Sequence, residues 1–207
     1  MKTQKLNLVI MAGLLLLPWN GFTQTKYKLI PDESKMVIHG TSTIHNWEMP
    51  AKKFTGEMDV EGVDEGAIQI SDVALRVEAK SISSDSRIMD NKTHDALKVD
   101  KNPSITFDYG GVAGLTDDEG KFSGTAEGKL SIAGKLNTVQ LPFTGVVGKE
   151  GKIEVKGSVG IKMSDYGITP PTAMLGALKT GNEVLVEYTF VFGRDSEPST
   201  SETGGIQ

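Results

Sequence analysis

Polar and apolar residues alternate strictly from Lys121 to Ile132, and this period constrains the fold of the chain more than any other feature. One set of alternate positions is entirely polar, whereas the other contains Phe122, Leu130 and Ile132 together with glycine and alanine. A period of two places successive side chains on opposite faces of a strand. The segment is therefore predicted to be a β-strand with one face in water and one face buried.

The same period recurs along the chain and predicts an all-β fold. The alternating segments are 36–44, 54–60, 68–79, 105–109, 121–132, 139–147, 153–163 and 184–192. Most connections are short and rich in Gly, Asp or Asn, which makes consecutive strands antiparallel neighbours. About eight such strands can close into a barrel without exposed edges, and a two-sheet sandwich is the alternative closure. A slip in the alternation at Ser71 and Asp72 predicts a β-bulge.

Two segments lack the alternation. Ser83–Pro103 carries apolar residues among charges and is expected to form one or two short helical turns that close against the barrel, with Asp85 as a cap. The segment 164–182 is a long, partly apolar connection, which is typical of a lid, a plug or a binding surface. The residues of this loop that are expected to guard the mouth of the barrel are Met174, Leu175 and Leu178.

Residues 1–24 have the order of a secretory signal peptide. Two lysines precede an apolar run from Leu8 to Leu17, which is too short to span a bilayer. We expect residues 25–193 to form the barrel domain and the polar residues 194–207 to form a disordered tail. The expected location of the protein is the periplasm or the extracellular medium.

Composition and motifs exclude several classes of function. The formal net charge of -5 and the absence of a basic cluster argue against a nucleic-acid partner. The chain has no cysteine, so disulfides, iron–sulfur clusters and thiol nucleophiles are excluded. Its 3 histidines show no converging pattern of metal ligands, and neither a nucleophile elbow nor a phosphate-binding loop is present. We therefore predict no enzyme activity, no bound metal and no cofactor.

Glycine is frequent on the predicted inward face of the strands. The inward glycines are Gly40, Gly56, Gly124, Gly128, Gly145 and Gly157. Two explanations stay open, because glycine permits the tight coiling of barrel strands and also leaves space for a ligand. The other inward residues are Phe, Ile, Val, Leu and Met, so such a space would be apolar and would suit a hydrocarbon chain.

Four stretches of the sequence resemble the YceI-like family of polyisoprenoid-binding proteins. They are "YKLIPDESKMVIHGTSTIHNWEM" with the following "KKFTGEMDVEG", then "HDALKVDKNPSITFDYGG", "GTAEGKLSIAGKLNTVQLPFTG" and "SDYGI". Together they extend from Tyr27 to Phe192 in the order of the family. The resemblance implies a lipocalin-like antiparallel barrel with a long apolar tunnel, in mostly exported proteins that bind isoprenoid lipids. The family's "R-D-x-x-L" element is spread out here over Arg87, Asp90 and Leu97, and no invariant binding residue carries over.

The main hypothesis from the sequence is an exported protein that holds an isoprenoid or another long-chain lipid in its barrel, for sequestration or transport. Its other expected features are transient membrane contact, no transmembrane span and no nucleic-acid partner; the sequence indicates no oligomeric state. The residues expected to bind the ligand are Phe54, Met58, Phe107, Tyr109, Phe122, Gly124, Gly128, Leu130, Phe143, Val155, Ile161, Met174, Leu175, Leu178, Val186, Tyr188 and Phe190.

Two alternatives stay open at this level. In one, the barrel is filled by its own side chains and serves as a ligand-free structural or stress-response protein. In the other, polar residues near the mouth such as His45, His94 or Asp165 would act on a bound lipid.

Overall fold

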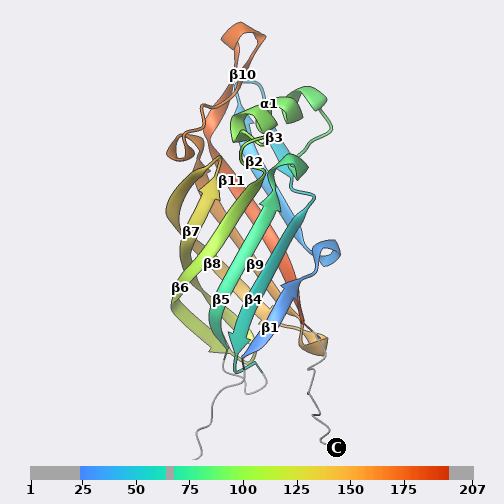
Figure 1. Ribbon diagram of the computed structural model, residues 1–207, viewed down its shortest axis with the longest axis vertical. Helices are drawn as coiled ribbons and strands as arrows, with labels where there is room; N and C mark the ends of the chain where they lie inside the picture. Colours follow the sequence, from blue (N-terminus) through green and yellow to red (C-terminus); the bar gives the residue numbers. More distant parts are fainter. Residues whose placement is uncertain (1–23, 64–67, 196–207) are drawn as a thin grey trace, which may run out of the picture.

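The computed structural model describes residues 24–63 and 68–195, which form an antiparallel β-barrel (Figure 1). The predicted segments 1–24 and 194–207 lie outside the described residues except for their innermost positions. The strands are β1 (Thr25–Leu29), β2 (Lys35–Ser42), β3 (Asn46–Pro50), β4 (Phe54–Glu61), β5 (Gln69–Glu78), β6 (Ser104–Asp118), β7 (Lys121–Ile132), β8 (Lys135–Val147), β9 (Ile153–Lys162), β10 (Thr172–Ala173) and β11 (Leu178–Arg194). The helices are α1 (Arg87–Leu97) and the 3-10 turns η1 (Pro31–Glu33), η2 (Ala79–Ser81), η3 (Lys149–Gly151), η4 (Met163–Tyr166) and η5 (Met174–Gly176).

Eight of the strands close into a ring. The hydrogen-bonded order is β1-β4-β5-β6-β7-β8-β9-β11, and β11 pairs back onto β1. This closure confirms the predicted all-β antiparallel barrel of eight strands and excludes the sandwich. The predicted number of eight strands is confirmed, but one of the eight differs. The sequence pattern missed β1, which belongs to the ring, and included β2, which lies outside it. β1 escaped notice because its 5 residues are too few for a clear period.

Strand β11 connects the ring to an additional hairpin. Its 17 residues pair with β9 along one edge. Along the other edge, its end pairs with β1 from Phe192 to Arg194, whereas Thr180 to Thr189 pair with β2. The hairpin of β2 and β3 therefore extends the wall of the barrel at one end only. An isolated bridge between Ala51 and Ile82 links this hairpin to the turn that leads into α1.

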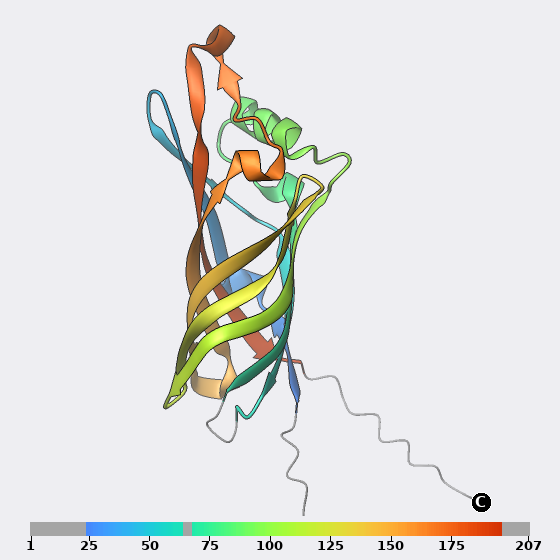
Figure 2. The same ribbon diagram turned by 90° about the vertical axis from the view of Figure 1, so that its left-hand side faces the viewer.

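The two ends of the barrel differ. Helix α1, the tip of the β2–β3 hairpin and the β10–β11 hairpin gather at one end (Figures 1 and 2). The described ends of the chain lie at the opposite end, where Tyr27 pairs with Arg194 and the Asp195 amide donates to the Lys26 carbonyl. We refer to the end that carries α1 as the mouth end.

The predicted bulge is confirmed in β5. Asp59 is opposite Asp72, whereas the next residue, Val60, is opposite Ile70, so Ser71 has no partner residue. The Ser71 hydroxyl instead donates to the Asp59 carbonyl at 3.1 Å. The extra residue keeps Ile70 and Val73 on the inner face on both sides of the slip.

The helical segment is longer than the sequence pattern predicted. α1 has 11 residues, and its N-cap is Ser86 rather than Asp85, with the Ser86 hydroxyl accepting from the Met89 amide. None of its residues is fully buried, because the helix covers the barrel with only a narrow apolar stripe. That narrow stripe is the reason why the periodicity of the sequence indicated short turns.

Aromatic rings fill part of the barrel interior, from Phe122 beside the β6–β7 turn to Phe54 at the start of β4. We call Phe54, Phe122, Phe143, Phe190 and Phe192 the aromatic floor. The Phe54 and Phe190 ring centroids are 5.7 Å apart, and those of Phe122 and Phe143 are 6.1 Å apart. All five side chains are buried. The rings therefore pack closely on one another, and Phe143, Phe190 and Phe192 also face the cavity described below.

The inward glycines make room for side chains of neighbouring strands, most of them aromatic. A Cβ atom at Gly145 would overlap the Phe122 ring, and one at Gly40 would overlap the Trp47 ring. At Gly128, a Cβ atom would lie 2.5 Å from the Phe107 ring and 2.5 Å from the Asp108 carbonyl oxygen. The volume missing from the glycine positions is thus occupied within the protein. That volume is therefore not open to a ligand, and the glycines have a packing role besides any role in strand curvature.

Candidate functional site

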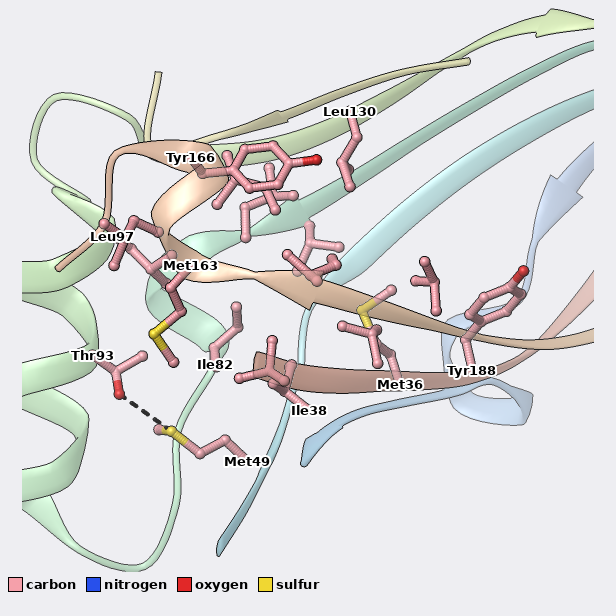
Figure 3. A pocket seen from close by; sticks show the side chains of 18 of the residues that line it. Met36, Ile38, Met49, Ile82, Thr93, Leu97, Leu130, Met163, Tyr166 and Tyr188 are labelled. Carbon is pink, nitrogen blue, oxygen red and sulfur yellow. Dashed lines mark hydrogen bonds between the residues drawn. The ribbon is translucent and has the colours of Figure 1, made fainter. Parts of the chain in front are cut away.

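A cavity of about 450 Å³ lies between the aromatic floor and α1. Its wall is built by inward residues of the long strands, which alternate with outward polar residues as the period of two requires. Met36 and Ile38 of β2 lie opposite Tyr188 and Val186 of β11 in the strand register. Figure 3 shows how these side chains and those of neighbouring strands point into the same hollow. Strand parity therefore decides which side chains of the wall face the cavity.

The roof of the cavity consists of α1 and residues 163–168. From α1, Met89, Thr93 and Leu97 line the cavity, and Met163 and Tyr166 complete the roof (Figure 3). These residues pack on the two apolar clusters of the barrel, so the roof is part of the core of the molecule. The cavity is covered on this side by a helix instead of by strands.

Three polar contacts hold α1 on the barrel. The Thr93 hydroxyl donates to Sδ of Met49 at 3.3 Å (Figure 3). Nε2 of His94 lies 3.0 Å from the Ile82 carbonyl oxygen, and Nζ of Lys92 donates to the Thr172 carbonyl at 2.7 Å. The helix is thus attached to three different segments with few buried apolar residues. Such a marginal attachment favours local opening.

Few polar groups reach the cavity. The described residues that line it include no carboxylate, and its only lysines are Lys92 and Lys179. Burial raises the pKa of Tyr188 to about 12 and also raises the pKa of Tyr109, so both phenols are neutral at physiological pH. The Tyr109 hydroxyl donates to the Ile70 carbonyl at 3.1 Å, which satisfies its donor within the wall.

The cavity contains no arrangement for acid–base catalysis among the described residues. Of the three candidates for an enzyme, only His45 lines the cavity. His94 is engaged with the Ile82 carbonyl, and Asp165 is exposed. No three potential metal ligands come together within 24–63 and 68–195. The geometry is that of a binding site for an apolar molecule.

Most of the predicted ligand-binding residues line this cavity. They are Met58, Phe107, Tyr109, Leu130, Phe143, Val155, Ile161, Leu178, Val186, Tyr188 and Phe190. All of them except Leu178 were predicted from strand parity, and Leu178 was predicted from the mouth loop.

The other predicted residues lie elsewhere. Phe54 and Phe122 are buried in the aromatic floor and do not line the cavity. Gly124 and Gly128 are covered by neighbouring side chains, among them Val112 and Phe107. Leu175 is fully exposed at the tip of the β10–β11 hairpin. Met174 precedes it in η5, and its side chain lies outside the described part.

The list of predicted ligand-binding residues omits those that close the cavity, although Met163 ends an alternating segment and Leu97 lies in the segment expected to close against the barrel. Met49, Ile82, Leu97, Met163 and Tyr166 come from short or irregular elements. In the sequence, the apolar residues of α1 stand out among the charges of the segment and indicate a buried side. Their position over the cavity depends on the contacts of the helix with Met49 and Ile82 and not on local periodicity.

Comparisons with known proteins agree with this architecture. A family model described as the YceI-like domain matches residues 27–192. The structure of a polyisoprenoid binding domain from Saccharophagus degradans, implicated in plant cell wall breakdown, is similar with a TM-score of 0.65 and 15% identity, covering 82% of this chain and 98% of that domain. No match was found among curated proteins.

Two further solved structures have the same fold. Burkholderia cenocepacia BcnA is similar with a TM-score of 0.63 and 20% identity, covering 79% of this chain and 98% of BcnA. A Campylobacter jejuni YceI protein is similar with a TM-score of 0.57 and 20% identity, covering 75% of this chain and 88% of that protein. In the ranges that the structure describes, no helix has the length and hydropathy needed to cross a membrane.

Proposed function

Because the chain belongs to the YceI-like family, we propose that it binds an isoprenoid chain, such as a polyprenyl lipid or an isoprenoid quinone, in the cavity below α1. The observation that carries this proposal is the cavity itself, which is lined by aliphatic and aromatic side chains and by no carboxylate among the described residues. The similar domain from Saccharophagus degradans is described as polyisoprenoid binding, which supports the choice of ligand class.

The size of the cavity suits this ligand class. Its volume of about 450 Å³ lies in the range of about 300–1,000 Å³ that is common for ligand pockets. At about 0.8 kcal/mol per buried carbon, a fully buried five-carbon isoprene unit contributes roughly 4 kcal/mol. About four such units exceed an association cost on the order of 4–15 kcal/mol, so a partly enclosed chain is sufficient for binding.

The cavity also distinguishes this proposal from its alternatives. A ligand-free structural barrel would gain dispersion energy if its own side chains filled the hollow. Here the side chains of the aromatic floor pack on one another, and the cavity beside them stays open. A lipid-modifying enzyme needs an acid or base beside its substrate, whereas the titratable groups of the described lining are His45, two lysines at the opening and neutral tyrosines, with no carboxylate.

We further propose that the protein carries or sequesters its ligand outside the cytoplasm. The order of lysines and apolar residues at the start of the sequence supports export. A chain without cysteine is compatible with an oxidising compartment, since it has no thiol to protect.

The test is native mass spectrometry of the protein recovered from a bacterial periplasm, followed by lipid extraction. We expect one isoprenoid lipid per chain. Ala126→Phe, at a small lining residue of β7, places a large ring in the cavity and should strongly reduce loading without loss of thermal stability. Glu127→Phe, at the exposed neighbour on the outer face, is the matched control and should load normally. A wild-type protein that stays empty when offered isoprenoids would refute the proposal.

A further inference from the structure

Large apolar side chains are exposed at the tips of three separate segments at the mouth end. Ile44, in the turn between β2 and β3, is 63% exposed, and Ile88, in the first turn of α1, is 73% exposed. Leu175, in η5 between β10 and β11, is fully exposed. We call these three residues the apolar rim. Turns are normally occupied by Gly, Asn, Asp, Ser and Pro, so exposed leucine and isoleucine at three tips require an explanation.

The opposite end of the barrel has no such feature in its described turns. The turn between β6 and β7 exposes Asp118 and Glu119, and the turn between β8 and β9 exposes Glu150. Outside the rim, the described residues contain only two other exposed large apolar side chains, Leu136 and Leu185. The apolar exposure is therefore concentrated at the mouth end.

The backbone of Leu175 adds an independent observation. Its φ of 54° and ψ of 34° lie in the left-handed region, where glycine or asparagine is favoured and a leucine side chain is uncommon. Leu175 makes no buried contact that could offset this strain, since it is fully exposed. Strain that packing does not explain is a feature of functional surfaces.

The rim is continuous with the cavity. Ile44 and Ile88 line the cavity at its mouth as well as being exposed, so apolar surface extends from the interior to the tips. The only lysines of the described lining, Lys92 and Lys179, lie at this same opening. We propose that the apolar rim docks on the surface of a lipid bilayer, so that an isoprenoid passes between the membrane and the cavity without crossing water. This inference rests on the proposed function.

The test measures which end of the barrel touches a membrane. Because the chain has no cysteine, a single polarity-sensitive dye can be attached at Thr43→Cys, beside Ile44, or at Asp118→Cys, at the opposite end. With vesicles of phosphatidylethanolamine and phosphatidylglycerol, we expect a blue shift of the dye at position 43 and none at position 118. A shift at position 118 alone would overturn the proposal. It would mean that the membrane contacts the end of the barrel that carries the described chain termini, opposite the rim.

Rim variants test the residues. The variant with Ile44→Ser, Ile88→Ser and Leu175→Ser should reduce the fraction of protein bound to vesicles by about tenfold, because three apolar side chains no longer enter the interface. Leu185→Ser, at an exposed leucine on the wall of β11, is the control and should bind vesicles like the wild type. Equal vesicle binding by the rim variant and the wild type would overturn the proposal. A rim variant that differs from the wild type only in self-association, measured by sedimentation, would also overturn it.

Loading in detergent separates this inference from the proposed function. The single variant Leu175→Ser changes the rim without changing a residue that lines the cavity. With farnesol delivered from detergent micelles, it should load to the same extent as the wild type, whereas its loading from vesicles should be slower. A protein that takes up no isoprenoid from either source would refute the proposed function. A protein that loads from vesicles at the same rate with and without the rim would refute membrane docking alone.

Discussion

The ring of Tyr188 lies over Gly157, its partner on the neighbouring strand. The two residues are opposite each other in the register of β9 and β11, and a Cβ atom at position 157 would overlap the phenol ring. The same position would place that Cβ 2.6 Å from the Pro142 carbonyl oxygen of β8. The glycine thus permits an aromatic side chain to lie against the wall of the cavity.

This relationship predicts the cost of adding a single methyl group. Gly157→Ala should lower the free energy of unfolding by about 1–3 kcal/mol, because the ring and the carbonyl must both shift. Gly160→Ala, three residues along the same strand, is the control, since a Cβ atom there has no neighbour within 4 Å. It should leave stability unchanged or raise it slightly, because alanine restricts the unfolded chain. Urea denaturation midpoints of the two variants would decide.

Tyr188 also predicts a dependence of stability on alkaline pH. Burial raises its pKa from 10.0 to about 12 in the folded protein. Between these two values the unfolded state releases the proton and the folded state retains it. The contribution of Tyr188 to stability is therefore complete below pH 10.0 and declines as the pH rises towards 12. The slope approaches about 1.4 kcal/mol per pH unit for one proton.

Tyr188→Phe is the variant that isolates this effect. The difference in unfolding free energy between wild type and variant should be constant up to about pH 10 and should shift in favour of the variant above it. The hydroxyl is 3.5 Å from the Pro142 carbonyl oxygen, so its loss removes only a weak hydrogen bond. Parallel pH curves for the two proteins would contradict the raised pKa.

The cap of α1 predicts a change in ligand exchange. Ser86→Ala removes the hydroxyl that accepts from the Met89 amide, at a cost of about 0.5–2 kcal/mol to the helix. Because α1 covers the cavity, hydrogen exchange in α1 and the rate of isoprenoid release should both increase. Ser86→Asp supplies another capping oxygen and should restore both values. Asp85→Ala should have no effect on the helix, and a larger effect there than at Ser86 would contradict the assigned cap.

Trp47 provides a reporter of occupancy. Its ring lies over Gly40 and lines the cavity near the mouth, and its indole nitrogen donates to the Thr41 carbonyl at 3.0 Å. In a Trp19→Phe background, Trp47 is the only tryptophan. Titration with an isoprenoid quinone should quench its fluorescence, since quinones accept electrons from excited indole at short range. The Ala126→Phe variant should show much weaker quenching, and a response identical to the wild type would place the ligand elsewhere.

The sequence by itself determined the strands and their inner faces. Alternation of polar and apolar residues depends only on the geometry of a single strand, so it identified Leu130, Phe143 and Val186 as inward and located the bulge at Ser71. It also predicted an antiparallel arrangement, because short turns make neighbouring strands antiparallel, and left open whether the strands close as a barrel or a sandwich. Resemblance to a family indicated the class of ligand. The strand faces, the bulge and the turns are local properties, and each can be read within a few residues.

Only the tertiary structure decided how the interior is divided between packed side chains and open cavity. The space beside Gly128 or Gly157 is filled by Phe107 or Tyr188, and which ring covers which glycine depends on the register between strands. The roof depends likewise on where α1 meets Met49. Contacts between distant segments leave no period in the sequence, because each partner is local to a different part of the chain. The cavity is therefore a property of the assembled barrel.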